Sequence, residues 1–204
     1  AGDDTVSVAA NREQLKSELA LPSVPCWLNQ QHGDEVATLD VATEGLAVDG
    51  AVTTRPGVVL AVLSADCLPV LLSDRAGSMV AAVHAGWRGL AAGLIARAVA
   101  LLPPASDLIA WLGPAIGPTA YEVGRDVYAA LATGAAGYDA AFAPQSGDRW
   151  LVDLPALARR QLHQLGVESV FGGDCCTYTN PDRWFSYRRD GETGRMATLI
   201  WLEH

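Results

Sequence analysis

Apolar runs broken by turn-forming residues alternate along this chain with segments of helical periodicity. The most apolar run, residues 58–72, is interrupted at 65–67 by Ala-Asp-Cys, so it predicts two strands that meet at a kink. Residues 79–83 predict another strand, which leads directly into a helix over 86–101 with one apolar stripe. Such junctions hold polar groups beside a buried core, and function often lies there in α/β proteins.

The rest of the chain predicts the same mixture of elements. Asp153 is a typical helix cap, and Pro155 follows just inside the helix that it begins. Residues 184–202 predict a β-hairpin that turns at 190–194. Further helices are expected at 10–20, 122–132 and 153–166, further strands at 36–45, 108–112, 149–152 and 167–173, and a loose segment at 133–148. Crossover and hairpin connections together indicate an α+β (mixed α/β) fold.

The composition excludes several classes of protein. The 204 residues are 50% apolar and 18% charged, which fits one domain with a substantial core. The net charge is −9 and there is no cluster of Lys or Arg, so we expect no nucleic-acid partner. The apolar run 58–72 contains Ser64, Asp66 and Pro69, and we therefore expect no membrane span.

The cysteines and the chain ends indicate the compartment and the extent of the domain. Four cysteines are too few for a disulfide framework in a chain of this size, and the acidic N-terminus is unlike a signal peptide. A reducing, cytoplasmic setting is therefore expected. The chain starts without Met, which suggests a trimmed start, and residues 203–204 resemble the beginning of a purification tag. We assign a single domain to residues 1–202.

Histidine is scarce, and its four positions differ in context. His204 belongs to the tag remnant, and His163 lies with two arginines on the polar side of a helix, where a solvated side chain is expected. His32 and His84 each stand near glycine or a small residue, so a backbone or a ligand can come close. These two histidines are the candidates for function.

Cys67 adds a third candidate ligand. Like His84, it comes where an apolar strand ends, and two strand-end side chains of one sheet can converge. With His32 they would supply two imidazoles and a thiolate, a set that suits zinc with a fourth position open. The separations, from 32 to 67 and from 67 to 84, are too long for a local chelating motif. The spacing alone therefore leaves open that Cys67 and His84 are ordinary core residues.

Asp66, next to Cys67, has two interpretations. Its carboxylate could carry protons for a metal-activated water, or orient His84 from behind. It could equally be a turn residue that accepts hydrogen bonds from the next backbone N–H groups. The sequence leaves both interpretations open.

Two arginine segments could bind an anion. Residues 86–89 begin a helix, where unpaired N–H groups favour an anion, and Arg88 adds a forked donor. Arg188 and Arg189 form a pair beside aromatic residues, which could also be a solvated rim paired with Asp190.

Several motifs together resemble one family, the YfiH-like proteins. Its members are often labelled multicopper polyphenol oxidases or laccase-domain proteins, and more recently purine nucleoside phosphorylases with adenosine deaminase activity. The motifs that carry the resemblance are NQQHG, SADCLPVLL, AAVHAGWRGL, AWLGPAIGP, YEVG, DCCTY and FSYRRDGETGRMATLIWL. Two features depart from the family: Gln31 stands where valine is usual, and several tens of residues at the start, including an Arg-Gly-Gly segment, are absent.

The resemblance implies a four-layer α/β/β/α fold with mixed sheets and a single metal, usually zinc, held by two histidines and a cysteine. Those positions match His32, Cys67 and His84. It also implies a pocket for a purine nucleoside and phosphate, with the motif arginine falling on Arg188 or Arg189. We therefore expect small-molecule partners and phosphorolysis of purine nucleosides, with adenosine deamination as a second activity. The expected catalytic residues are Cys67, His84 and Asp66, and the expected phosphate-binding residues are Arg88, Arg188 and Arg189.

Three alternatives use the same residues differently. The family label keeps a copper phenol oxidase as the main alternative, although three native histidines are too few for the trinuclear cluster of a multicopper laccase. A hydrolase would use Cys67 as nucleophile and His84 as base. In a purely structural zinc site, Cys175 or Cys176 would have to complete the ligand shell.

Overall fold

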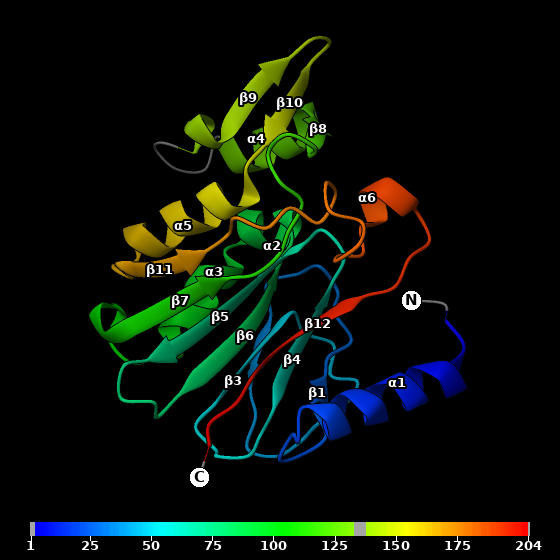
Figure 1. Ribbon diagram of the computed structural model, residues 1–204. Helices are drawn as coiled ribbons and strands as arrows, with labels where there is room; N and C mark the ends of the chain where they lie inside the picture. The colour runs from blue at the N-terminus through cyan, green and yellow to red at the C-terminus, as the bar shows by residue number, and fades with distance from the viewer. Residues whose placement is uncertain (1–2, 133–137, 204) are drawn as a thin grey trace.

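Two β-sheets packed face to face form the centre of the structure (Figure 1). The computed structural model describes residues 3–132 and 138–203. The larger sheet has the strand order β11-β7-β5-β6-β3-β2, and the smaller has the order β1-β4-β12. The larger sheet consists of β2 (Val36–Thr38), β3 (Gly50–Thr53), β5 (Leu68–Asp74), β6 (Val80–Ala85), β7 (Leu108–Leu112) and β11 (Ser169–Gly172). The smaller sheet consists of β1 (Cys26–Trp27), β4 (Leu60–Ser64) and β12 (Met196–Ile200).

Both sheets contain parallel and antiparallel pairs. In the larger sheet β5 is antiparallel to β6 and β7, whereas the edge strands β2 and β11 run parallel to their neighbours. In the smaller sheet β4 is parallel to β1 and antiparallel to β12. A third, antiparallel sheet lies at the top of Figure 1 beside α4 (Arg125–Ala132) and contains β8 (Glu122–Gly124), β10 (Arg149–Val152) and β9 (Phe142–Gln145). The predicted mixed fold is confirmed.

Helices cover one face of the larger sheet, and the smaller sheet covers part of the other. The first face packs against α2 (Trp87–Ala92), α3 (Leu94–Ala100) and α5 (Leu154–Gln164). A second apolar core, between the sheets, combines residues of β3, β4 and β6. Outside the smaller sheet α1 (Thr5–Glu18) lies beside β1, with Arg12 4.5 Å from the centre of the Trp27 ring (Figure 1). These layers give the expected α/β/β/α order. In the part of the chain that the structure describes, no helix is long and apolar enough for a membrane span.

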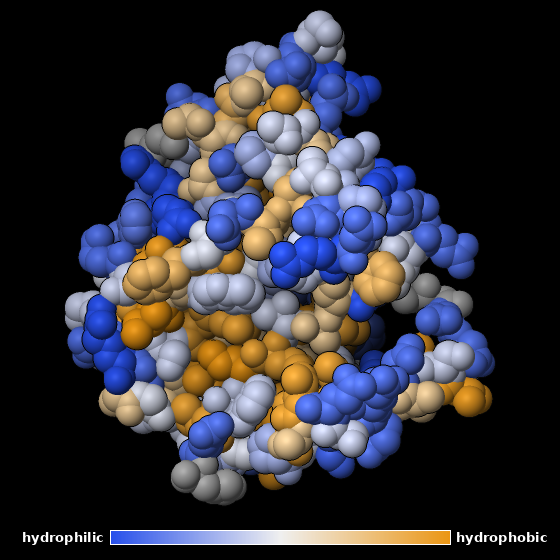
Figure 2. All heavy atoms as spheres, viewed as in Figure 1, coloured by the Kyte–Doolittle hydropathy of each residue, from blue (hydrophilic) through white to orange (hydrophobic). Residues whose placement is uncertain are grey.

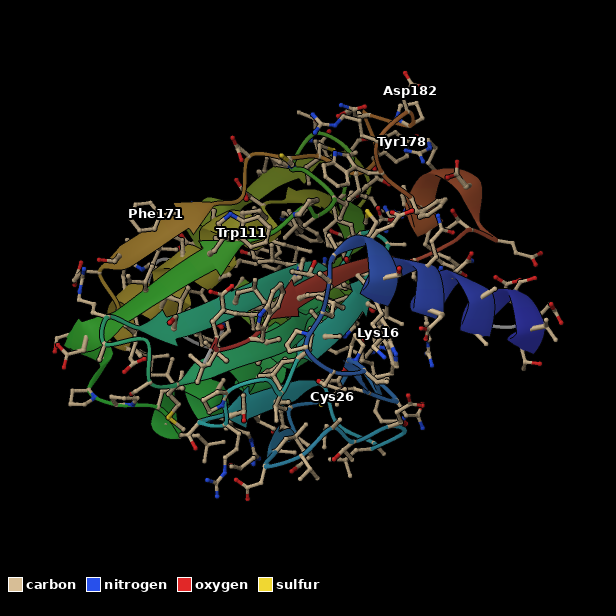
Figure 3. The ribbon with its side chains drawn as sticks, turned by 60° about the horizontal axis from the view of Figure 1, so that its bottom comes forward. Lys16, Cys26, Trp111, Phe171, Tyr178 and Asp182 are labelled. Atoms are coloured by element: carbon tan, nitrogen blue, oxygen red, sulfur yellow. The ribbon has the colours of Figure 1, made fainter. Side chains whose placement is uncertain are left out.

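The smaller sheet leaves the side of the larger sheet near β11 uncovered. Trp111 of β7 and Phe171 of β11 are paired in the strand register and are 41% and 58% exposed. Figure 2 shows apolar residues gathered on this face, and Figure 3 shows the two rings next to each other. This side of the sheet therefore presents an exposed apolar surface.

A sharp turn carries the chain from the smaller sheet into the larger one. β4 ends at Ser64 and β5 begins at Leu68, and the two strands belong to different sheets. Asp66 lies between them with a φ of +99°, which residues other than glycine rarely adopt. This turn is the predicted kink, and it places Cys67 at the junction of the sheets.

Three predicted elements differ from the structure. The helix expected over 86–101 is broken at Gly93, whose φ of +89° ends α2 and begins α3. The hairpin expected over 184–202 is wrong, because its first arm forms the short helix α6 (Tyr187–Asp190) and only β12 is extended. Residues 122–124 form strand β8, not the start of a helix, because they pair with β10.

Three predicted boundaries also move. The strand expected at 36–45 ends at Thr38. The first helix begins at Thr5, because the Asp4 carboxylate caps it by accepting from the N–H of Ser7. In the segment expected to be loose, residues 133–137 lie outside the described residues, and the strand β9 pairs with β10. Short 3-10 turns precede β7 and β9, at Ala105–Asp107 and Asp139–Ala141.

Candidate metal centre

The three side chains predicted as metal ligands converge at one end of the packed sheets. His32 lies on the loop between β1 and β2, Cys67 lies in the turn between the sheets, and His84 is the second-last residue of β6. One ligand-type atom from each lies within 4.8 Å of the others. The two imidazole rings meet edge to face, with 4.8 Å between their centres. His32 is exposed and His84 is buried, so the cluster opens to solvent on the His32 side.

Cys67 is held in a form suited to metal binding. Burial raises the pKa of its thiol, but hydrogen bonds and charge interactions with His32 and His84 outweigh burial and lower the pKa to about 6. At neutral pH the thiolate therefore predominates, and thiolate is the form that binds metal. Gly86 allows this arrangement, because a Cβ at that position would lie 3.1 Å from Cys67 Sγ.

His84 is oriented by Asp49, a residue that no motif or spacing indicated. Asp49 Oδ1 lies 3.0 Å from His84 Nδ1, and both side chains are almost fully buried. Burial lowers the pKa of His84, but Asp49 and Cys67 raise it to about 9. Burial alone would raise the pKa of Asp49, yet the hydrogen bonds from His84 and from the backbone of residues 31–33 hold it below its usual value. The one signal of Asp49 in the sequence is its position directly before the apolar strand β3.

The loop that carries His32 is fixed at two points. The N–H groups of Gln31, His32 and Gly33 all donate to the carboxylate of Asp49. Next to them, the Gln30 side chain both donates to the carbonyl of Leu63 and accepts from its N–H, at 2.8 and 2.7 Å. The loop is thereby joined to β4, which leads into the turn with Cys67.

Asp66 holds the C-terminal segment against this turn. Its Oδ1 accepts from the hydroxyl of Thr177, and its Oδ2 accepts from the N–H of Arg188 at 2.7 Å. The place beside His84 Nδ1 that Asp66 could have taken is occupied by Asp49. The Asp66 carboxylate therefore acts as an acceptor for backbone and side-chain donors far along the chain, and proton transfer by Asp66 stays a prediction.

The three predicted arginines have different surroundings. The side chain of Arg189 donates to the carbonyls of Thr177, Tyr178 and Trp184 and pairs with Asp190, so its donors are used within the C-terminal segment. The guanidinium of Arg188 lies 5.1 Å from the centre of the Tyr121 ring, donates to the carbonyl of Glu122, and is exposed. Arg88, also exposed, stacks on its neighbour Trp87 at 4.3 Å.

Tyr121 links the arginines to the ligand cluster. Burial, followed by the negative charge of Cys67, raises the pKa of its phenol to about 12, and the charges of Arg188 and Arg88 oppose that rise. All of these groups therefore act on the same phenol. Tyr121 remains protonated at neutral pH and can donate a hydrogen bond. No motif had marked it as a site residue beyond its place in YEVG.

The adjacent residues Cys175 and Cys176 and the third described histidine, His163, lie outside the cluster. The Sγ of Cys176 accepts from the N–H of Gly117 at 3.2 Å, and Cys175 is exposed. Within the described residues, the cluster of possible metal ligands consists of His32, Cys67 and His84 and includes neither of these cysteines. His163 is exposed on α5, as predicted.

Known proteins resemble this chain over nearly its full length. The model of a family described as multi-copper polyphenol oxidoreductase laccase matches residues 1–203. A purine nucleoside phosphorylase of Xylella fastidiosa is 49% identical over 211 residues, covering 99% of this chain and 81% of the relative. The purine nucleoside phosphorylase YfiH of Escherichia coli is 49% identical over 205 residues, covering 98% and 83%.

Solved structures give the same result for the fold. The protein NMB0706 of Neisseria meningitidis superposes with a TM-score of 0.92 at 44% identity, covering all of this chain and 84% of the neighbour. A YfiH protein of Bacillus licheniformis gives a TM-score of 0.92 at 29% identity, covering 99% and 83%.

Proposed function

Since the chain belongs to the family of multi-copper polyphenol oxidoreductase laccase proteins, and its close relatives carry the name purine nucleoside phosphorylase, we propose that it cleaves purine nucleosides with phosphate in a zinc-dependent reaction. The observation that carries this proposal is the cluster of His32, Cys67 and His84 beside a tyrosine and two exposed arginines.

The donor set fits zinc. Two imidazoles and a thiolate are ligands that zinc prefers, and three protein ligands with an open fourth position are typical of catalytic zinc. Bond lengths to zinc imply separations of roughly 3.3–3.6 Å between donor atoms. The present separations of up to 4.8 Å therefore require the side chains to draw in by about 1 Å. When bound, zinc would polarise a substrate atom or lower the pKa of a water.

Phosphate would be bound by the arginines, not by the metal. The guanidinium of Arg188 is exposed, and one of its N–H groups donates to the carbonyl of Glu122. Arg88 extends from the first turn of α2. Both charges act on Tyr121, whose protonated phenol adds a neutral donor on the same side. Such forked donors suit a phosphate oxygen that attacks C1′ of the ribose while the bond to the purine breaks.

Arg189 receives a different role. Its donors are engaged by three backbone carbonyls and Asp190, so we assign it to holding the C-terminal segment and Arg188 to phosphate. The two arginines thus receive separate roles, and the sequence had not decided which of them binds phosphate.

Deamination of adenosine is the second candidate activity at the same cluster. A metal with an open position beside a proton carrier is the arrangement that such hydrolysis needs. Asp66 is the proposed carrier, since it adjoins Cys67. The oxygens of Asp66 also accept hydrogen bonds from Thr177 and Arg188. The variant Asp66→Asn tests the role in proton transfer, and in this variant deamination should fall more than phosphorolysis.

Copper chemistry is the alternative function that the family name suggests. A two-histidine, one-cysteine set also suits a single copper. A multicopper laccase needs many more histidines than the four in this chain. Such a copper could take Met79 or Met196 as an axial ligand. Met79 precedes β6 and is separated from His84 by about 16 Å of extended strand, so Met196, which pairs with Ser64 next to the turn of Cys67, is the remaining candidate. Phenol oxidation would therefore have to come from one substituted copper.

The test measures metal content and turnover on the same unsupplemented protein. We expect about one zinc per chain and release of hypoxanthine from inosine that depends on phosphate. Arg188→Ala should raise the KM for phosphate and leave Tm unchanged, whereas the matched variant Arg189→Ala should lower Tm. Hypoxanthine release that is indifferent to phosphate and to Arg188→Ala, or phenol oxidation by bound copper without nucleoside cleavage, would sink the proposal.

A further inference from the structure

A single buried carboxylate contacts both histidines of the candidate metal centre. Asp49 lies directly before β3, is inaccessible to solvent, and accepts four hydrogen bonds. Its Oδ1 accepts from His32 N–H and lies against His84 Nδ1, and its Oδ2 accepts from the N–H groups of Gln31 and Gly33. We propose that Asp49 is a positioning residue that sets the geometry of both histidine ligands together.

The first arm of this arrangement fixes the ring of His84. The backbones of the two residues are already joined, because His84 N–H donates to the carbonyl of Asp49 at 2.7 Å. Asp49 Oδ1 then engages Nδ1 at 3.0 Å. With Nδ1 committed to the carboxylate, Nε2 is the nitrogen left for a metal.

The second arm holds the backbone that carries His32. His32 has a φ of +58°, in the left-handed region that residues other than glycine seldom occupy. Three successive N–H groups converge on the carboxylate from this loop, at 3.0, 2.9 and 2.7 Å. The left-handed conformation of His32 and the direction of its ring therefore depend on the same carboxylate that orients His84.

The number of donors explains why aspartate is needed here and asparagine would not serve. Each oxygen of Asp49 accepts from two donors. An asparagine amide has one oxygen, and its NH2 group would face two donors in either orientation. Either His32 N–H and His84 lose their acceptor, or the N–H groups of Gln31 and Gly33 do. In both cases the loop of His32 is released.

The chain offers a matched control for a buried aspartate that accepts from a backbone turn. Asp74 is buried at the far end of β5 and accepts from the N–H and hydroxyl of Ser78 and from the N–H of Met79. It contacts no residue of the metal cluster. Asp74→Asn therefore reproduces the loss of a buried acceptor without touching His32 or His84.

The experiment compares zinc affinity by competition with a chelator in the wild-type protein, Asp49→Asn and Asp74→Asn. Loss of a residue that supports metal ligands typically weakens metal affinity about 10–100-fold, which is the expected result for Asp49→Asn. Asp74→Asn should keep the wild-type affinity even where it lowers Tm. Equal zinc affinity in the two variants would overturn the proposal.

A spectroscopic measurement distinguishes positioning from general destabilisation. In the zinc-loaded wild-type protein labelled with 15N-histidine, the proton of His84 should be on Nδ1 and the metal on Nε2. Signals of both His32 and His84 should move in Asp49→Asn and stay in place in Asp74→Asn. If Asp49→Asn does not fold, the wild-type spectrum still decides: a His84 without a proton on Nδ1 contradicts the proposal.

The inference rests on the proposed metal centre and not on the proposed substrate. Failure of the two proposals is therefore distinguishable. Zinc affinity and histidine signals that respond to Asp49→Asn support the positioning role, even in a protein that never cleaves inosine.

Discussion

Replacing Thr177 with valine tests whether one hydrogen bond holds the C-terminal segment against the turn that carries Cys67. Thr177 is fully buried and Asp66 nearly so, and the threonine hydroxyl donates to Asp66 Oδ1. Valine keeps the shape of threonine and removes the donor. The carboxylate then retains its bond from Arg188 N–H, but one of its oxygens is left buried without a donor.

The expected cost follows from the burial and the charge. A hydrogen bond to a charged group contributes about 1.5–3 kcal/mol to stability. The desolvation cost of leaving its buried partner unpaired falls within that same range. For a chain of this length, Tm shifts by about 2–4 °C for each kcal/mol. Thr177→Val should therefore lower Tm by roughly 3–12 °C.

The assay is thermal unfolding of the zinc-loaded protein, with Thr177→Ser as the matched control because serine keeps the hydroxyl. Serine should recover most of the lost Tm. The segment that begins at Thr177 also leads to Arg188, so we expect a higher KM for phosphate in Thr177→Val while zinc content stays the same. A valine variant with the Tm of the serine variant would refute the reasoning.

Two further predictions concern the metal cluster. Against the effect of burial, Asp49 and Cys67 raise the pKa of metal-free His84 to about 9, and the histidines lower that of Cys67 to about 6. Near neutral pH the imidazole is protonated and the thiol is not, so zinc binding should release about one proton, rising below pH 6 as Cys67 also becomes protonated. Calorimetry in two buffers of different ionisation enthalpy measures this, and zinc binding without proton release would contradict the two pKa values. Gly86→Ala places a Cβ 3.1 Å from Cys67 Sγ, so zinc affinity should fall in a chelator competition, and an unchanged affinity would show that the turn can adjust.

The convergence of Cys67 and His84 could be predicted because it depends on local signals. An apolar run broken at 65–67 and a strand that ends at a histidine both mark strand ends, and the structure brings these ends together. His32 has no such mark. It became a candidate because histidine is scarce in this chain and because Gly33 stands next to it, and the resemblance of its motif to a known family strengthened that prediction.

Asp49 could not be found in this way, because its role is made by tertiary structure. An aspartate between Val48 and Gly50 looks like an ordinary turn residue. It becomes an anchor through the pairing of β3 with β6, which brings it beside His84, and through a loop that folds back over it.

The predicted hairpin failed for a related reason. Its first arm, with Phe185 and Tyr187, has the aromatic content of a strand. In the structure the Ser186 hydroxyl accepts from the N–H of Arg189, and Asp66 accepts from that of Arg188. These bonds cap a single helical turn. The acceptor of the second bond, Asp66, lies more than a hundred positions earlier in the chain.

Because the chain passes from one sheet to the other at residues 65–67, the candidate site connects the two sheets. His84 belongs to the larger sheet, Cys67 lies on the chain segment between the sheets, and the loop of His32 is tied to the smaller sheet through Gln30 and Leu63. Any sliding of one sheet over the other would change the distances among the three donor atoms. A bound ion would therefore act as a crosslink between the sheets and would stabilise the fold in proportion to the logarithm of its concentration above Kd.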